Sequence, residues 1–294
     1  MSGNHLDHLD VFYGELTPAR ATVYARLEGL ENTAKLTLGG FVRGPRCIYS
    51  KTLPATFRLQ DAGPGPSLLA KSLIPDPSYW SPDTPHIYDV SVELRNGDDI
   101  LASEVRQIGF KPLGISGRFF TWEGKPWVLR GVGSHHFTQN LDVLNWREQS
   151  AVIVGNALGN ELLSKASEYG VICCSLINDQ LSACSEFRRL AKYPSVALTA
   201  LFRQYKGIAA AEAPNLICSE AIVPRMQYCR LPGPRINYVL FDSDADENAM
   251  KALESPALID RSISTPKSFI EARAACDKLQ ADLAPIGQFA GYIV

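Results

Sequence analysis

Hydrophobic residues follow two different rhythms in the two parts of this chain, and that change constrains the fold more than any other feature. Up to about residue 115, apolar residues alternate with polar ones in short segments separated by turns rich in glycine and proline. From about residue 116, apolar runs of strand length alternate with segments that have a helical repeat. Two-residue alternation is typical of strands with one buried face, and strand–helix alternation is typical of parallel sheets. We therefore expect two domains, 1–115 and 116–294.

The first domain is expected to be an antiparallel β-sandwich. Alternating segments occur at Ala21–Leu27, Lys35–Leu38 and Tyr88–Leu94, with glycine- and proline-rich turns between them. Asn96-Gly97 lies between two apolar segments and predicts a hairpin with a type I′ turn, whose two central residues both need positive φ. Several short strands at this spacing indicate an immunoglobulin-like sandwich.

The second domain is expected to have parallel strands joined by helices. Six or seven strands would fit either an open doubly wound sheet or a reduced (β/α) TIM-type barrel. About 180 residues remain for it, whereas a full barrel takes roughly 250, so some elements should be short or missing. The strand candidates are Trp127–Val132, Ala151–Val154, Val171–Leu176, Val196–Leu201, Leu216–Ser219, Ile236–Phe241 and Leu258–Ile263. The helix candidates are Asn160–Tyr169, Ser182–Leu190, Glu247–Leu253 and Ser268–Leu283.

The last of these helices has an apolar pattern that predicts which side is buried. Phe269, Ile270, Ala274, Leu279 and Leu283 are expected to line one face of it.

Composition excludes several classes of protein. The formal net charge is -2 and the basic residues are scattered, so no stripe predicts nucleic-acid binding. No segment approaches the roughly 20 apolar residues of a membrane helix, and the polar N-terminus lacks a signal pattern, so we expect a cytoplasmic protein without membrane contact. The 7 cysteines include no C-x-x-C pair. Buried reduced thiols are therefore expected rather than disulfides or zinc, and no metal or cofactor is predicted.

Three local motifs occur in order near the expected domain junction. Pro77–Tyr88 reads PSYWSPDTPHIY, Ile108–Lys111 reads IGFK, and Phe120–Val132 reads FTWEGKPWVLRGV. From Pro75 to Phe137 the chain resembles the family 2 glycoside hydrolases, the group that contains β-galactosidases and β-glucuronidases. The motifs are similar to the end of that family's sandwich domain, its last strand, and its first hairpin and barrel strand. The resemblance implies an immunoglobulin-like sandwich followed by a shortened barrel, carbohydrate as the partner, and descent from enzymes that hydrolyse O-glycosidic bonds.

The resemblance also implies where the catalytic groups should be. A retaining glycosidase needs two carboxyl groups about 5 Å apart. Where the family has the acid glutamate that ends its fourth barrel strand, this chain has Gln204. An amide has no acidic proton, so the general acid would be missing. Asn215–Glu220 resembles the strand that ends in the family's nucleophile, which makes Glu220 the candidate nucleophile; the alternative is a glutamate in a solvated loop.

Three residues are candidates for holding a sugar. Arg130 in the first barrel strand matches a family arginine, and His135 or its neighbour His136 falls where the family has a histidine. Asn156 follows the second strand, whose end otherwise lacks the family's polar groups. The alternatives are an ion pair for Arg130 and a solvated loop for the histidines.

An acidic cluster, Asp242–Glu247, follows the apolar run Tyr238–Phe241. It fits the negatively charged first turn of a helix, a site for a divalent cation, or phosphatase-like chemistry. Neither the G-x-S-x-G nor the phosphate-binding glycine motifs occur in the sequence. Two hypotheses remain: a carbohydrate-binding or scaffold protein that has lost catalysis, and an active retaining β-glycosidase that uses Glu220 and an acid elsewhere.

Overall fold

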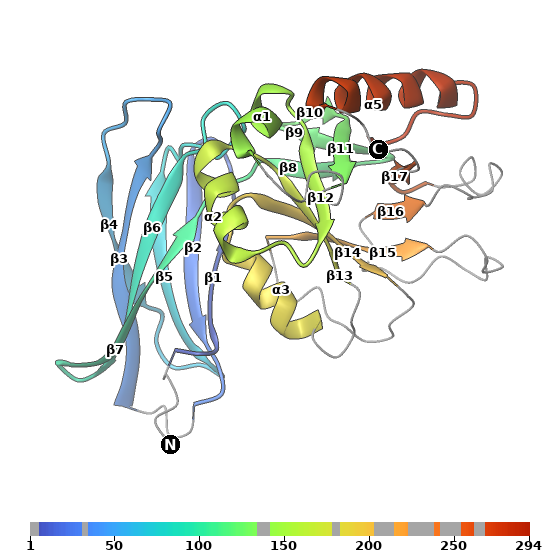
Figure 1. Ribbon diagram of the computed structural model, residues 1–294. Helices are drawn as coiled ribbons and strands as arrows, with labels where there is room; N and C mark the ends of the chain where they lie inside the picture. The colour runs from blue at the N-terminus through green and yellow to red at the C-terminus, as the bar shows by residue number, and fades with distance from the viewer. Residues whose placement is uncertain are drawn as a thin grey trace. The chain divides into compact units, whose positions relative to one another are not determined.

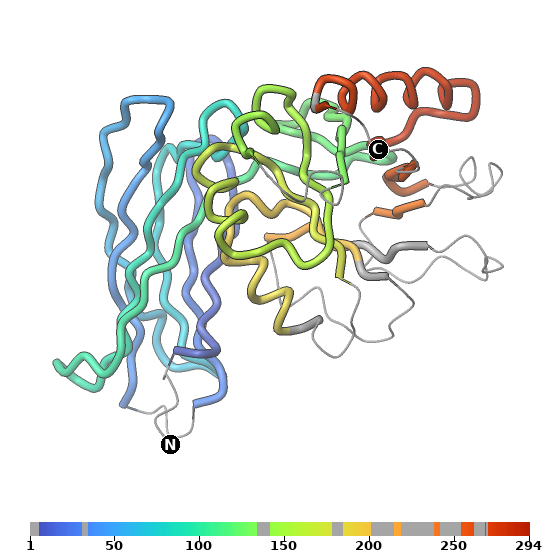
Figure 2. The backbone as a smooth tube through the Cα atoms, viewed as in Figure 1, coloured from blue at the N-terminus to red at the C-terminus, as the bar shows by residue number. Residues whose placement is uncertain are grey.

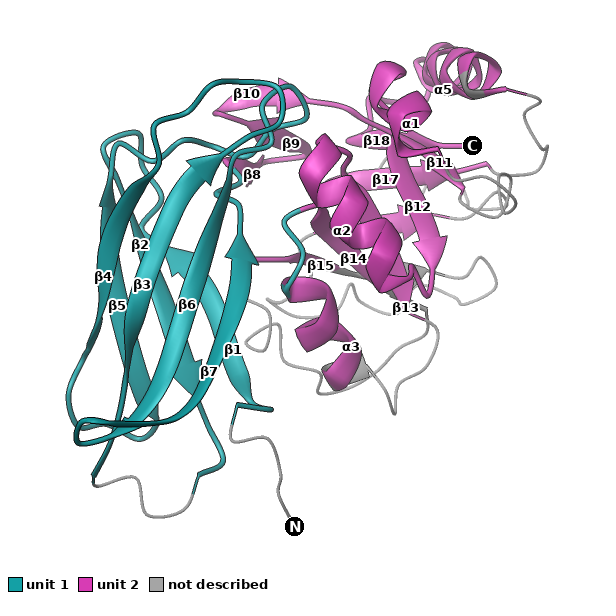
Figure 3. Cartoon of the chain, turned by 60° about the vertical axis from the view of Figure 1, so that its left-hand side comes forward, with its two compact units in different colours: residues 1–111, 192–194 teal, residues 112–191, 195–294 magenta. Residues whose placement is uncertain are grey.

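The computed structural model describes residues 6–30, 35–133, 142–177, 183–202, 215–222, 238–241, 254–261 and 268–294. The chain divides into two compact units, drawn in different colours in Figure 3. One contains residues 1–111 and 192–194, and the other contains residues 112–191 and 195–294. The division therefore falls after Lys111, a few residues before the boundary expected from the sequence.

The first unit is an antiparallel β-sandwich, as predicted. Its strands form one seven-stranded sheet in the order β1-β2-β5-β4-β3-β6-β7 (Figure 1). Buried residues alternate with more exposed ones in β2, β5 and β6, as predicted. The buried residues of the unit form a common core that includes Val23, Leu38, Val90 and Phe110. The strands are β1 Leu9–Gly14, β2 Arg20–Leu27, β3 Leu36–Arg46, β4 Ala55–Asp61, β5 Leu68–Pro75, β6 Ile87–Asn96 and β7 Asp99–Ile108.

The predicted hairpin joins β6 to β7, but its turn lies one residue later than expected. Asn96 pairs with Asp99, so Gly97 and Asp98 are the two loop residues. Gly97 has a φ of 61°, but Asp98 has no positive φ, so the predicted type I′ turn is wrong; glycine at the first loop position is typical of a type II′ turn. An irregularity in the ladder between Leu94 and Arg95 shifts the register, and alternation alone does not reveal such a bulge.

The motif residues at the end of this unit serve its packing. Trp80 is completely buried and its backbone N–H donates to the carbonyl of Phe110 at 2.9 Å. A Cβ on Gly109 would lie 2.8 Å from Cβ of Trp80, so a glycine is needed beneath the indole. The Tyr13 hydroxyl accepts from the N–H of Lys111 at 3.1 Å and donates to its carbonyl at 3.2 Å. Burial raises the pKa of Tyr13 to about 12, so its hydroxyl stays protonated and keeps both hydrogen bonds at neutral pH.

The second unit is a parallel barrel preceded by a small antiparallel sheet (Figures 1 and 2). The small sheet contains β8 Leu113–Ser116, β9 Phe119–Trp122 and β10 Lys125–Trp127. The barrel strands neighbour one another in chain order, and β18 closes the sheet by pairing with β11. They are β11 Leu129–Gly133, β12 Val152–Asn156, β13 Cys173–Ile177, β14 Val196–Phe202, β15 Ile217–Ile222, β16 Tyr238–Phe241, β17 Ala257–Asp260 and β18 Gly291–Ile293.

The barrel is thus closed and eight-stranded, so the expectation of six or seven strands was wrong, as was the open-sheet alternative. The strand that the sequence reading missed is β18, which has only 3 residues. A run that short carries no measurable alternation.

Four helices lie in the part of the chain that the structure describes: α1 Val143–Glu148, α2 Asn160–Tyr169, α3 Ala183–Ala191 and α5 Phe269–Leu283. The last three match predicted helices, whereas α1 was not predicted, and Glu247–Leu253 lies outside the described residues.

The buried face of α5 agrees with the predicted one only in part: Leu283 is buried and Leu279 packs against the core, as predicted, but Ala274 is exposed. Ile270 is 69% exposed, while the buried positions are Ala272, Cys276 and Leu283. The small side chains at Ala272 and Cys276 let the helix approach the barrel closely: Sγ of Cys276 lies 3.3 Å from the carbonyl oxygen of Gly131 on β11. The face of α5 that packs on the barrel is therefore determined by the small size of its side chains more than by their hydrophobicity.

Candidate active site

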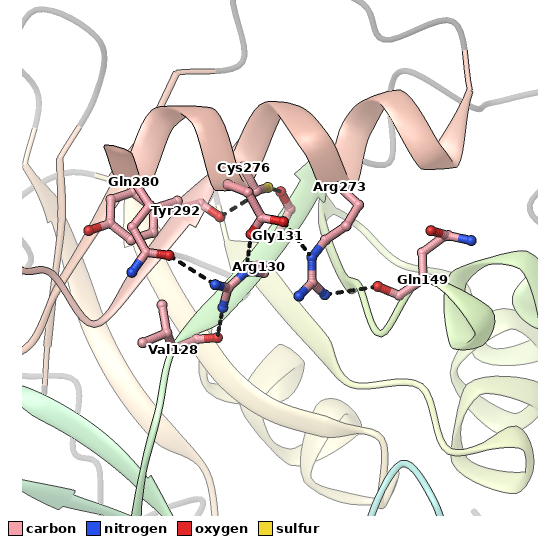
Figure 4. A network of polar contacts seen from close by, with 9 residues as sticks. Val128, Arg130, Gly131, Gln149, Arg273, Cys276, Gln280 and Tyr292 are labelled. Carbon is pink, nitrogen blue, oxygen red and sulfur yellow. Dashed lines mark hydrogen bonds and ion pairs between the residues drawn. The ribbon is translucent and has the colours of Figure 1, made fainter. Parts of the chain in front are cut away.

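Residues of the barrel strands alternate between the side that faces the helices and the interior. Arg130 pairs with Tyr292, and Tyr292 pairs with Ile259, so these three lie on the same side of β11, β18 and β17. Arg130 reaches α5, so this side faces the helix (Figure 4). The intervening positions face the interior: a Cβ on Gly291 would lie 2.5 Å from Cδ2 of Leu258.

The barrel interior is packed around Tyr238. This residue is fully buried, and its hydroxyl donates to the carbonyl of Thr199 at 2.8 Å and lies 3.8 Å from Sγ of Cys174. Its ring meets Phe120 of β9 edge to face, with centroids 5.7 Å apart. Burial raises the pKa of Cys174 to about 12 and that of Tyr238 well above its ordinary value. Both groups are therefore protonated at neutral pH and belong to the core rather than to a reactive centre.

Two polar side chains occupy the carboxyl ends of barrel strands, where barrel enzymes place their active sites. Asn156 is the last residue of β12 and is exposed, and Asp260 is the last residue of β17 and is half-buried. Asp260 pairs with Ile293, which pairs with the interior position Gly131. The charge of Asp260 also contributes to the raised pKa of Cys174, as expected for a carboxylate near the barrel interior. We call Asn156 and Asp260 the mouth pair.

Asp260 was missed by the sequence reading. The weak strand candidate Leu258–Ile263 placed this aspartate inside a strand, whereas β17 ends at it. The useful signal would have been the abrupt change from the apolar run Ala257–Ile259 to Asp260-Arg261.

Arg130 is held on the helix side of β11 (Figure 4). Its Nε donates to Oδ1 of Asp277 at 2.6 Å and its Nη2 donates to Oε1 of Gln280 at 2.9 Å, both on α5. Arg273 of the same helix approaches the other oxygen of Asp277 at 3.4 Å. The hydrogen bond from Arg130 is the main cause of the lowered pKa of Asp277. The ion pair considered from the sequence is present, and it ties the first barrel strand to the last helix, away from the mouth pair.

The remaining predicted site residues are only partly placed. Glu220 is the fourth residue of β15, the fifth barrel strand, and it pairs with Leu201 of β14 and Val239 of β16. β14 is the fourth barrel strand and ends two residues before Gln204.

Gln204 itself, His135 and the acidic cluster Asp242–Glu247 lie outside the described residues. The predicted proximity of Glu220 and Gln204 therefore stays a prediction.

No group of three or more histidine, cysteine, aspartate or glutamate residues is placed to hold a metal ion within the ranges given above. No helix in that part of the chain is long and apolar enough to cross a membrane. Of the cysteines placed by the structure, Cys173, Cys174, Cys218 and Cys276 are buried free thiols, as predicted, and Cys47 is half-buried.

Comparison with known proteins agrees with the sandwich-and-barrel architecture. Residues 50–111 match the model of the glycosyl hydrolases family 2. A β-galactosidase of Klebsiella pneumoniae (strain 342) is 29% identical over 99 residues, which is 34% of this chain and 9% of that relative. The chain is therefore similar to the family 2 glycosyl hydrolases over part of its length. It spans a small part of the curated relatives that it matches.

Solved structures of the same group share the fold over nearly the whole chain. A β-glucuronidase of Bacteroides uniformis superposes with a TM-score of 0.59 at 17% identity, covering 98% of this chain and 45% of that one. A Bifidobacterium dentium β-glucuronidase complexed with coumarin-3-O-glucuronide gives a TM-score of 0.59 at 13% identity, covering 94% and 56%. The family 2-like chain therefore contains about half the length of these structural neighbours.

Proposed function

We propose that this family 2-like protein binds carbohydrate at the mouth of a shortened barrel, and that it hydrolyses glycosides poorly or not at all. The observation that carries the proposal is the position of β14. It is the fourth barrel strand, and two residues after its end the sequence has Gln204 where the resemblance calls for the acid glutamate. An amide cannot protonate a leaving oxygen at neutral pH, so the bond-breaking step would lack its general acid.

The mouth pair supports the binding half of the proposal. The amide of Asn156 both donates and accepts hydrogen bonds, and the carboxylate of Asp260 accepts them. Sugar hydroxyls both donate and accept hydrogen bonds, so each of the two side chains could contact a different hydroxyl of a sugar. Carbohydrate is also what the structural neighbours are named for, and one of them holds a glucuronide.

The alternative function is an active retaining β-glycosidase. The specific observation in its favour is Asp260, a carboxylate on the interior side of the sheet at the carboxyl end of β17. Glu220 pairs with Val239, which pairs with Ala257, so its register position is on the other side of the sheet. Retention requires the two carboxyl groups to approach within about 5–5.5 Å.

Chromogenic substrates separate the two functions. p-Nitrophenyl β-galactoside, β-glucuronide and β-mannoside should release nitrophenol no faster with the wild-type protein than with Glu220→Gln. A rate that falls at least tenfold in Glu220→Gln or in Asp260→Asn would contradict impaired catalysis and establish the glycosidase.

A thermal-shift titration with the corresponding free sugars tests binding. A sugar present at 100 times its Kd stabilises the folded protein by about 2.7 kcal/mol, which gives a clear rise in Tm. Asp260→Asn and Asn156→Ala should each reduce that rise, whereas Asp282→Asn, an exposed aspartate on α5, is the matched control. If none of the sugars raises the Tm, the binding proposal is wrong.

A further inference from the structure

A hollow lies on the outward face of the sandwich unit, on strands β3, β4 and β6 and wholly within that unit. Its volume is about 590 Å³, within the range of roughly 300–1,000 Å³ found for small-molecule sites. Aromatic, charged and amide side chains surround it. The lining residues are Thr37, Leu38, Gly39, Gly40, Phe41, Arg58, Leu59, Gln60, Asp61, Glu93 and Arg95.

The hollow exists because Gly39 has no side chain. Leu38 is buried in the core, so the alternating positions Gly39 and Phe41 lie on the outward face of β3. A Cβ on Gly39 would meet only the carbonyl oxygen of Leu59, at an ordinary 3.6 Å. By contrast, Gly40 has a φ of 135° and a Cβ there would lie 1.9 Å from the carbonyl oxygen of Ser91. The fold therefore requires glycine at 40 but not at 39, where a side chain would simply fill the hollow.

One wall of the hollow is an exposed aromatic ring. Phe41 is 47% exposed, and it pairs with Arg58 on β4 and with Ser91 on β6. An exposed flat ring beside polar side chains offers an apolar platform with hydrogen-bonding groups at its edge.

The opposite wall is a fixed ion pair. Oε2 of Glu93 accepts from Nε of Arg95 at 3.0 Å and from its Nη2 at 2.5 Å. Two hydrogen bonds from one guanidinium hold both side chains in place. Glu93 also pairs with Gly39 across β3 and β6, so its carboxylate lies next to the floor of the hollow. The two bonds use a single oxygen of Glu93, and a carboxylate can accept at both.

The charges around the hollow are balanced. The lining contains two basic residues, Arg58 and Arg95, and two acidic ones, Asp61 and Glu93. Asp61 is already engaged, since it accepts from the N–H of Leu38 at 3.0 Å and from that of Gly63 at 2.7 Å. A balanced site has no net attraction for an anion, so it favours a neutral ligand with many hydrogen-bonding groups.

We propose that this hollow is a second carbohydrate-binding site, which takes a neutral hexopyranose unit of a glycan. The C–H face of the sugar ring stacks on Phe41, and its hydroxyls donate to Glu93 and accept from Arg58 and Arg95. The site is independent of the barrel mouth, because every residue that forms it lies in the sandwich unit. It would hold a glycan whether or not the barrel has catalytic activity.

Amide NMR of the full chain tests the site directly. Methyl β-D-galactopyranoside and methyl β-D-glucopyranoside are titrated at millimolar concentrations into the ¹⁵N-labelled protein. At least one should shift the amide signals of Gly39–Phe41 and Glu93–Arg95 in a saturable way. Methyl β-D-glucuronide, which carries a negative charge, should bind more weakly than the better of the two. Absence of saturable shifts at these amides, or tighter binding of the glucuronide, would overturn the proposal.

Variants assign the roles of ring and floor. Phe41→Ala should weaken binding by roughly three- to tenfold, the worth of one aromatic contact. Gly39→Val should abolish the shifts while leaving the rest of the spectrum unchanged, because its side chain fills the hollow. The matched control is Val105→Ala, a 61% exposed residue that pairs with Ser91 on the same face but does not line the hollow.

The outcome also distinguishes the two carbohydrate sites. Sugar shifts that survive Gly39→Val and disappear in Asp260→Asn would place binding in the barrel alone. That result would contradict the second site but would be consistent with the proposed function.

Discussion

Replacing Gly109 by alanine tests whether the family motif is a packing device. The new Cβ would lie 2.8 Å from Cβ of Trp80, 2.9 Å from its Cγ and 2.9 Å from Cβ of Pro194. Ordinary contacts begin near 3.4 Å, so three atoms close to the main chain would have to retreat by about half an ångström. Overpacking of this kind costs about 1–3 kcal/mol.

Three simultaneous clashes favour the upper part of that range. The unfolded chain has less conformational entropy with alanine than with glycine, which offsets about 0.4–1 kcal/mol of the cost. We therefore expect the sandwich to lose about 2 kcal/mol of stability.

Hydrogen exchange read by mass spectrometry measures this loss in the sandwich unit alone. Slowly exchanging peptides of β6 and β7 should exchange about 30-fold faster in Gly109→Ala, the equivalent of 2 kcal/mol. Peptides of β11–β13 in the barrel provide the internal reference. Gly39→Ala is the matched control, because its Cβ meets only an ordinary contact at 3.6 Å and should leave exchange unchanged or slower. A change below about threefold in Gly109→Ala would refute the packing argument.

Three further outcomes follow from the barrel unit. The pKa of Asp277 is lowered by Arg130, so its pairing stabilises the fold above the ordinary pKa of 3.8 and is lost as the pH falls through the lowered value. Asp277→Asn should therefore reduce the loss of stability towards acid pH, as measured by urea unfolding. The effect should be below about 1 kcal/mol because the group is exposed. An unchanged pH dependence of stability would contradict the prediction. At pH 8, iodoacetamide should label Cys47 in the native protein but not Cys174 or Cys276. Burial raises the pKa values of these two thiols to about 12. Labelling of either thiol in the native protein would contradict the packed interior. Tyr238→Phe should lower the free energy of unfolding in urea by about 1 kcal/mol, because it removes the hydrogen bond to Thr199. The control is Tyr24→Phe, whose ring stacks on Phe12 and which should leave the stability unchanged. Equal losses in the two variants would contradict a special role for the Tyr238 hydroxyl.

Apolar patterns predicted most of the architecture, because sandwich strands such as β6 bury alternate residues and barrel strands such as β13 are buried on both faces. Seven of the barrel strands and three described helices occur where the apolar patterns placed them. The eighth strand, Gly291–Ile293, is too short to carry a pattern, and its pairing with β11 depends on closure of the barrel. The face of α5 was mispredicted only in its first half, since Leu279 and Leu283 pack on the core as expected. Hydrophobicity favoured Ile270, but contact with Gly131 demanded a side chain as small as Cys276.

The candidate site was predicted less completely, because side-chain direction depends on register. Arg130 matches a family arginine in sequence, yet the strand alternation turns it toward Asp277 on α5. Asp260 carried no recognisable motif, and only the end of β17 brings it to the barrel mouth. A shift of one residue in a strand exchanges interior and helix-facing positions, so a motif match cannot by itself assign a residue to a site.

The strongest family signal and the chemistry of the family reside in different units. The matched segment, residues 50–111, lies entirely within the sandwich unit and contains no barrel strand. Two motif residues within that segment, Trp80 and Gly109, pack against each other. A residue that serves packing carries no information about catalysis, so similarity in this segment supports the architecture but not the activity. Activity must be decided by the carboxyl groups of the barrel, which is why the comparison of Glu220→Gln and Asp260→Asn with the wild-type protein is the decisive measurement.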